Sequence, residues 1–109
     1  MYISGYRCMW VVAMFDLPVN TKKARRAYTD FVKFLKRDGF TRMQFSVYAR
    51  HSSSKENATV HIGRIQGNLP PDGEVRILSV TDKQFERMGV FWGNSRKMPE
   101  ELPCQLSFF

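Results

Sequence analysis

An apolar run at residues 8–15, CMWVVAMF, constrains the fold of this chain more than any other feature. The run carries no charge, and its length suits one β-strand but falls far short of the roughly 20 residues that a membrane-spanning helix needs. Alternate residues of a strand point to opposite faces, and both sets are apolar here. The run is therefore predicted to be a strand buried on both faces, with Asp16 where the strand reaches the surface.

The residues that follow predict two helices and further strands. Helical spacing of apolar residues predicts a helix over residues 21–38, capped by Asn20 or Thr21 and stopped by Gly39. Alternation over residues 40–50 predicts a strand, either continuous or broken near residues 44–46, with Tyr48 on its polar face. After a turn at residues 51–54, a capping box at Ser53 predicts a second helix. Its expected buried positions are Ala58, His61, Ile62, Ile65 and Leu69.

Residues 74–80 predict another strand, and residues 85–92 a shorter one. This order predicts the α+β class, with a ferredoxin-like βαββαβ antiparallel sheet and two helices on one face. The predicted domain covers residues 1–92, and residues 93–109 form a C-terminal arm or extra strand that docks on a dimer mate or another partner. Because two helices cover one face only, an isologous homodimer is expected to cover the other.

The net charge of +7 is concentrated in residues 21–50, which hold nine basic and two acidic residues. Surface helices are often rich in Lys and Arg, but here only Asp30 and Asp38 could pair with them. An uncompensated stripe of cations favours a surface for the phosphates of a nucleic acid. The predicted nucleic-acid-binding residues are Lys22, Lys23, Arg25, Arg26, Lys33, Lys36, Arg37, Arg42 and Arg50.

The cysteines and histidines do not predict a metal centre. Cys8 and Cys104 stand far apart and outside any CxxC pattern, so two free thiols in a reducing cytoplasm are expected. His51 and His61 have no third ligand nearby, and His61 is expected in the core or at an interface. Because the apolar run ends in Asp-Leu-Pro without a small-residue cleavage site, a signal peptide is rejected, and the chain is expected to be cytoplasmic with no membrane partner.

Several short motifs together resemble a known family. They are Phe15-Asp16 at the end of the first strand, Gly39 after the first helix, and the sequence Gln44-x-Ser46-Val47-Tyr48. In this order they resemble the second core protein of the CRISPR adaptation module, a family of CRISPR-associated endonucleases, over residues 9–80. The tail, with Trp92, the pair at residues 100–101 and the apolar residues 106–109, is similar to longer members found beside type II effectors.

The resemblance implies a role for Asp16 as catalytic and metal-binding residue. One Mg or Mn ion would be shared with the dimer mate, and Phe15, Gln44, Ser46 and Tyr48 would lie near the dimer cleft. The sequence shows no second acidic residue near Asp16, so one subunit is not expected to build an all-carboxylate site. The alternative is that Asp16 only starts the Asp-Leu-Pro turn by accepting hydrogen bonds from backbone N–H groups.

Two functions follow from the resemblance. The first is a CRISPR adaptation subunit, a homodimer that binds prespacer and repeat duplex DNA without sequence preference and bridges dimers of the CRISPR integrase subunit. The second is a metal-dependent endonuclease that cuts RNA or DNA through Asp16 of both subunits, an activity that adaptation itself does not need. Toxin-like interferases share the fold and lack integrase binding. An RNA-binding domain of the RRM kind is disfavoured because its aromatic RNP motif is missing.

Overall fold

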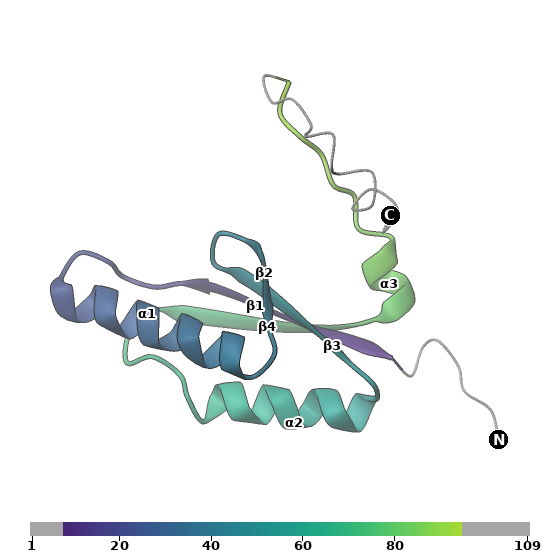
Figure 1. Cartoon of the computed structure of the whole chain (residues 1–109), viewed down its shortest axis with the longest axis horizontal. Coiled ribbons are helices and arrows are strands. Elements are labelled where there is room, and N and C mark those ends of the chain that lie inside the picture. The colour runs from purple at the N-terminus through teal and green to yellow at the C-terminus, as the bar shows by residue number, and fades with distance from the viewer. Residues whose placement is uncertain (1–7, 95–109) are drawn as a thin grey trace.

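The computed structural model describes residues 8–94, so Cys104 and nearly all of the predicted arm at residues 93–109 lie outside the described part (Figure 1). The elements in order are β1 (Met9–Asp16), α1 (Lys22–Arg37), β2 (Thr41–Gln44), β3 (Val47–Ser52), α2 (Lys55–Gln66), β4 (Glu74–Thr81) and α3 (Asp82–Glu86). Within residues 8–94, none of the helices has the length and apolar character needed to span a membrane.

The four strands form one sheet in the order β2-β3-β1-β4, and every neighbouring pair is antiparallel. The predicted α+β class and βαββαβ order are therefore confirmed, with α3 as a short addition after β4. The core joins Val11, Ala13 and Phe15 of β1 to Phe31 and Leu35 of α1, and to buried residues of α2. Both long helices consequently pack against one face of the sheet (Figure 1).

Within a single chain, only one face of β1 is fully buried. Val11, Ala13 and Phe15 are buried beneath the helices, but Trp10, Val12 and Met14 on the opposite face are only partly buried. We call this opposite side the open face of the sheet. Its residues remain partly exposed because α1 and α2 both pack on the other side.

The first helix begins and ends as its sequence predicts. The Thr21 hydroxyl accepts a hydrogen bond from the Ala24 backbone N–H over 3.0 Å, which caps α1. At the other end, Gly39 has a φ of 91°, a left-handed conformation that favours glycine. A Cβ atom at this position would overlap the guanidinium of Arg50, so both the conformation and the space require Gly39.

The predicted strand at residues 40–50 is broken into β2 and β3, with Phe45 and Ser46 at the turn. Ser46 adopts a φ of 62°, and the strand register shifts between Arg42 and Gln44. The placement of Tyr48 on a polar face is wrong, because Tyr48 is 4% exposed and stacks on Phe15 with ring centroids 5.8 Å apart. Tyr48 is buried because it pairs with Ala13 of β1, whose side chain lies in the core beneath the helices.

Three further boundaries correct the sequence analysis. The cap of α2 is Ser54 and not Ser53, because β3 continues to Ser52, which pairs with Met9. Leu69 is exposed and lies beyond the end of α2. The strand predicted at residues 85–92 is absent from the described structure.

Residues 82–86 form α3, which includes only Phe85 and Glu86 of that region, because Thr81 and Gln84 make a reciprocal capping box that favours a helix start. Residues 87–94 form no strand.

Asp38 joins the end of α1 to α2. Its carboxylate accepts hydrogen bonds from His61 Nδ1 over 2.8 Å and from an Arg64 guanidinium nitrogen over 2.7 Å, and its carbonyl accepts one from Arg50 over 2.8 Å. Burial raises the pKa of the Asp38 carboxyl, but the hydrogen bonds from His61 and Arg64 outweigh burial and hold that pKa below its ordinary value. The expectation that His61 is a core residue is confirmed.

Asp38→Asn tests this connection. The variant keeps the side-chain shape but loses the charge, so we expect the free energy of unfolding to fall by about 2 kcal/mol near neutral pH. Since the folded-state pKa lies below the unfolded value of about 3.9, the stabilisation is complete above that value and is lost as pH falls through the folded-state pKa. Urea denaturation of both proteins at several pH values measures the difference.

Asp30→Asn is the matched control, because Asp30 is exposed on the same helix and forms no ion pair within residues 8–94. We expect it to change stability by less than about 0.5 kcal/mol. A deficit of Asp38→Asn that persisted unchanged in strong acid would contradict the assignment.

Candidate nucleic-acid interface and carboxylate site

The exposed side of α1 carries a dense group of cations, which we call the basic face. Its members are all exposed: Lys22, Lys23, Arg25, Arg26, Lys33, Lys36 and Arg37. Arg25 donates a hydrogen bond to the Val19 carbonyl over 3.1 Å, and none of the seven forms an ion pair with a carboxylate of residues 8–94. Arg42 of β2 is exposed as well.

The positive charge of the basic face is offset by fewer carboxylates than its sequence indicates. Asp38 appeared available as a partner in the sequence, but its carboxylate is turned toward α2 and bound by His61 and Arg64. Asp30 is then the single exposed carboxylate on α1. In addition, Lys22 and Lys23 lie in the first turn of α1, where the helix dipole disfavours positive charge. This arrangement costs stability and favours binding of an anion such as phosphate.

Arg50 stands apart from the other predicted cations. It is half-buried, and its guanidinium donates to the Asp38 carbonyl beside Gly39. Its Nε atom is buried without a hydrogen-bond partner in residues 8–94. The structure therefore places Arg50 at the junction of α1 and β3, where it supports the end of α1.

Asp16 ends β1 and is exposed, as predicted for the point where the strand surfaces. By alternation its side chain lies on the open face with Trp10, Val12 and Met14. The alternative role as an anchor of the following turn lacks support, because the Asp16 carboxylate accepts no hydrogen bond from residues 8–94. Its oxygens are therefore free to bind a ligand.

A second carboxylate lies next to Asp16, contrary to expectation. The register of β1 and β4 places Glu74 directly opposite Asp16 on the open face. Directly opposed residues have Cβ atoms about 4.5–5.5 Å apart. Glu74 also forms an exposed ion pair with Arg76 over 3.2 Å. The sequence could not reveal this neighbour, because strand pairing brings it from the far end of the chain.

Gly73 allows this close approach. It has a φ of 95°, and a Cβ atom there would lie 2.7 Å from the Asp16 carbonyl oxygen and 2.7 Å from Leu17 Cδ2. The start of β4 therefore packs directly against the end of β1, and any larger residue would push Asp16 away from Glu74.

The residues expected at a dimer cleft are placed on different sides of the sheet. Phe15 and Tyr48 are buried in the core beneath the helices. Ser46 is half-buried, and its hydroxyl lies 2.9 Å from the Tyr28 hydroxyl, also on the helix side. Gln44 is exposed and pairs with Val47, whose own partner is Met14 on the open face. Of these four residues, only Gln44 shares a face with Asp16.

The open face carries an apolar strip that α3 covers at one end. There, Trp10 stacks on Phe85 with centroids 4.0 Å apart, and its Nε1 donates to Asp82 over 2.8 Å. Toward Asp16 the strip continues through Val12, with Leu78 opposite it and 49% exposed, and then through Met14 and Val47, which are partly exposed. Arg76 lies opposite Met14, between the strip and Glu74. A partly apolar sheet face beside a free carboxylate is suited to contact with another protein surface.

Comparison with known proteins identifies the family. The family model described as CRISPR associated protein Cas2 matches residues 9–88. The chain belongs to the Cas2 family. The match confirms the resemblance found in the sequence and extends beyond it into α3.

Two curated relatives, both named CRISPR-associated endoribonuclease Cas2, illustrate this similarity. One, from Parvibaculum lavamentivorans, is 54% identical over 101 residues, which cover 93% of this chain and all of the relative. The other, from Flavobacterium psychrophilum, is 40% identical over 107 residues, covering 98% of this chain and 93% of the relative. A solved structure, "Crystal structure of cas2", has a TM-score of 0.48 and 21% identity over 84% of this chain and 97% of the solved one.

The carboxylates of this Cas2-family chain fit a divalent metal ion in part. Mg²⁺ commonly binds through one or two carboxylates and completes its octahedron with water. Asp16 and Glu74 supply such oxygens on one exposed edge. Residues 8–94 contain no group of three His, Cys, Asp or Glu side chains that could hold a metal. One copy therefore offers two carboxylates, and waters, substrate or a second copy must complete the shell.

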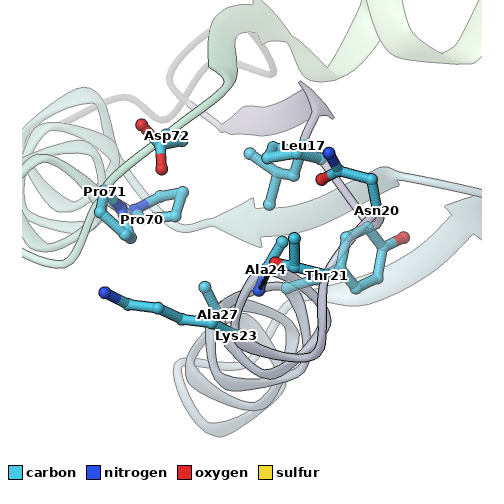
Figure 2. Close-up of a pocket in the computed structure, with 11 residues that line it drawn as sticks. Leu17, Asn20, Thr21, Lys23, Ala24, Ala27, Pro70, Pro71 and Asp72 are labelled. Carbon is cyan, nitrogen blue, oxygen red and sulfur yellow. Dashed lines mark hydrogen bonds between the residues drawn. The ribbon is translucent and has the colours of Figure 1, made fainter.

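A groove of about 360 Å³ lies beside this edge, between the start of α1 and the α2–β4 loop (Figure 2). Its walls are mostly apolar, with Leu17 on one side and Pro70 and Pro71 on the other. Figure 2 shows Lys23 extending from α1 toward the loop that carries Asp72. Asp16 does not line the groove, and among residues 8–94 its charged lining residues are Lys23, which belongs to the basic face, and Asp72. These residues do not make a set of catalytic groups.

The position of the basic face along α1 predicts opposite effects on stability at its two ends. Lys22 opposes the helix dipole and Arg37 complements it. We expect Lys22→Gln to be more stable than Arg37→Gln by about 1 kcal/mol at low salt. Urea denaturation of the two variants measures the difference, which should shrink as salt is added. Equal stabilities at low salt would contradict this account.

Proposed function

We propose that this chain is a nucleic-acid-binding, structural subunit of CRISPR adaptation. In this proposal a homodimer binds prespacer and repeat duplex DNA along the basic faces and bridges dimers of the integrase subunit. Membership of the Cas2 family supports a role in a CRISPR system. The observation that carries the proposal is the basic face itself, seven exposed cations without a carboxylate partner among residues 8–94.

Phosphate binding explains the geometry of the basic face. The 16 residues of α1 extend over roughly 24 Å, which corresponds to about seven base pairs of duplex DNA. Flexible Lys and Arg side chains on one helix face contact phosphates rather than base edges, so they provide affinity and register without sequence preference. Arg42 of β2 lies beyond the helix and extends the same charged surface.

The open face supports a homodimer. Its apolar strip, with Leu78 half-exposed, requires a covering surface, and a second copy supplies an identical one. Two open faces packed together would place Asp16 and Glu74 of both copies at one interface. The C-terminal arm at residues 93–109 is proposed to dock on the mate or on the integrase subunit. A type II system is proposed from that arm alone.

A second candidate function is a metal-dependent endonuclease on RNA or DNA. Both relatives described above carry the name endoribonuclease. Asp16 offers free carboxylate oxygens at a proposed interface, and Glu74, which is paired with Arg76, lies opposite it. A bound Mg or Mn ion would activate water for phosphodiester hydrolysis. Asp16 would hold the ion, and Glu74 would hold it directly or through water. Within residues 8–94, none of the α1 cations forms an ion pair with Asp16, and scaffolding does not require this chemistry.

Salt-dependent DNA binding tests the basic face. We expect Lys22→Gln and Arg37→Gln each to weaken binding to duplex DNA and to reduce the slope of log affinity against log salt by about 0.9. Because the two changes move stability in opposite directions, a common loss of binding reports phosphate contact rather than folding. Fluorescence anisotropy over a series of NaCl concentrations measures both quantities. Lys55→Gln, an exposed cation on α2, is the matched control and should bind as the unchanged protein does.

Array expansion in cells that carry the integrase separates the two candidate functions. We expect deletion of this chain to abolish new repeats and Asp16→Ala to leave expansion within about twofold of the unchanged protein, since scaffolding does not use the carboxylate. If Asp16→Ala also fails while the purified variant remains a folded dimer, adaptation depends on Asp16 and the purely structural proposal is wrong. Failure of the protein to co-purify with the integrase would favour an interferase instead.

A further inference from the structure

A second hollow lies between α1 and the β2–β3 turn, and it shares Lys36 and Arg42 with the surface proposed to bind duplex DNA. Its volume is about 390 Å³, within the range of roughly 300–1,000 Å³ typical of small-ligand sites. Tyr28 and Lys36 of α1 line one side, and Arg42, Phe45 and Ser46 line the other. Aromatic rings and cations thus meet in one place at the end of the basic face.

The aromatic part of the hollow is exposed and held in position. Phe45 is 71% exposed, although it stands at the tip of a short turn next to a packed core. Its ring lies almost parallel to that of Tyr28, with centroids 6.0 Å apart and 20° between the planes. The Tyr28 hydroxyl in turn lies 2.9 Å from the hydroxyl of Ser46, whose φ of 62° shapes the turn. One face of the Phe45 ring is therefore supported by protein, which leaves the ring available to a flat ligand.

The cationic part of the hollow is free. Neither Lys36 nor Arg42 makes a side-chain hydrogen bond or ion pair with residues 8–94, and both are exposed. No carboxylate of residues 8–94 lines the hollow. Two unpaired cations beside a supported aromatic ring favour a ligand that combines negative charge with a flat ring.

We propose that this hollow binds one unpaired nucleotide of a nucleic acid, with its base stacked on Phe45 and its phosphates contacted by Lys36 and Arg42. Every base has a π-face, so such stacking tolerates any sequence, and the cations supply contacts to the backbone. The inference rests on the proposed nucleic-acid interface, since Lys36 belongs to both surfaces. It adds a property that the basic face lacks, namely recognition of a strand end, flap or bulge beside a duplex.

The test compares a blunt DNA duplex with the same duplex carrying a single-stranded overhang that contains 2-aminopurine, whose fluorescence falls when the base stacks. We expect the full-length protein to bind the overhang duplex about fivefold to tenfold more tightly and to quench the probe. Phe45→Ala should lose both effects and bind the blunt duplex as before, whereas Phe45→Trp should retain both. Met43→Ala is the matched control, because Met43 is 40% exposed on β2 but does not line the hollow.

The outcomes separate this inference from the function on which it rests. If the protein binds the blunt duplex tightly but the overhang neither increases the affinity nor quenches the probe, the nucleotide site is overturned and the duplex-binding proposal stands. If the overhang probe is quenched but the protein does not bind the blunt duplex, the nucleotide site is supported and the proposed duplex-binding role of the basic face is wrong. Loss of both overturns both proposals.

Two further arms define the ligand. An overhang of ribonucleotides on the same duplex shows whether RNA occupies the hollow as DNA does. Quenching with either a ribose or a deoxyribose overhang supports the site. If Phe45→Ala instead weakens binding of the purified integrase and leaves the overhang effects unchanged, the hollow docks a protein and the proposal is wrong.

Discussion

The pairing of β1 with β3 on one side and β4 on the other is the constraint on which the rest of the structure depends. The backbone of a central strand is hydrogen-bonded on both sides, so other elements can pack only against the side chains on its two faces. Val11, Ala13 and Phe15 require both α1 and α2 on one face. The same pairing places Asp16 at the exposed end of β1 and Glu74 directly opposite it. One strand therefore organises the core, the open face and the carboxylate pair.

The carboxylate at the end of α1 interacts with α2 and not with the cations of α1. Asp38 is withdrawn from the surface of α1 and neutralised by His61 and Arg64, which ties the two helices together. The consequence for α1 is a face with hardly any negative charge to offset its cations. A contact that stabilises the fold thus also strengthens the positive field outside it, because the single carboxylate that supports the helix junction no longer screens its neighbours.

The basic face and the carboxylates lie on different sides of the sheet. The basic face points outward from α1, on the side that covers the core, whereas Asp16 and Glu74 lie on the open face. The groove beside Lys23 has mostly apolar walls (Figure 2). This separation explains how a scaffold and a hydrolase could share one fold while depending on different residues.

Local sequence determined the first strand, the first helix with its Thr21 cap and Gly39 stop, the order of the elements and the excess charge of α1. These features follow from periodicity, capping and composition, which act between residues close in the chain. The tertiary structure alone decided that Glu74 lies opposite Asp16, that Tyr48 is buried and that Arg50 supports the end of α1. It also brought Phe85 of α3 against Trp10 of β1. Those outcomes depend on strand register and on packing between distant segments, neither of which a local pattern specifies.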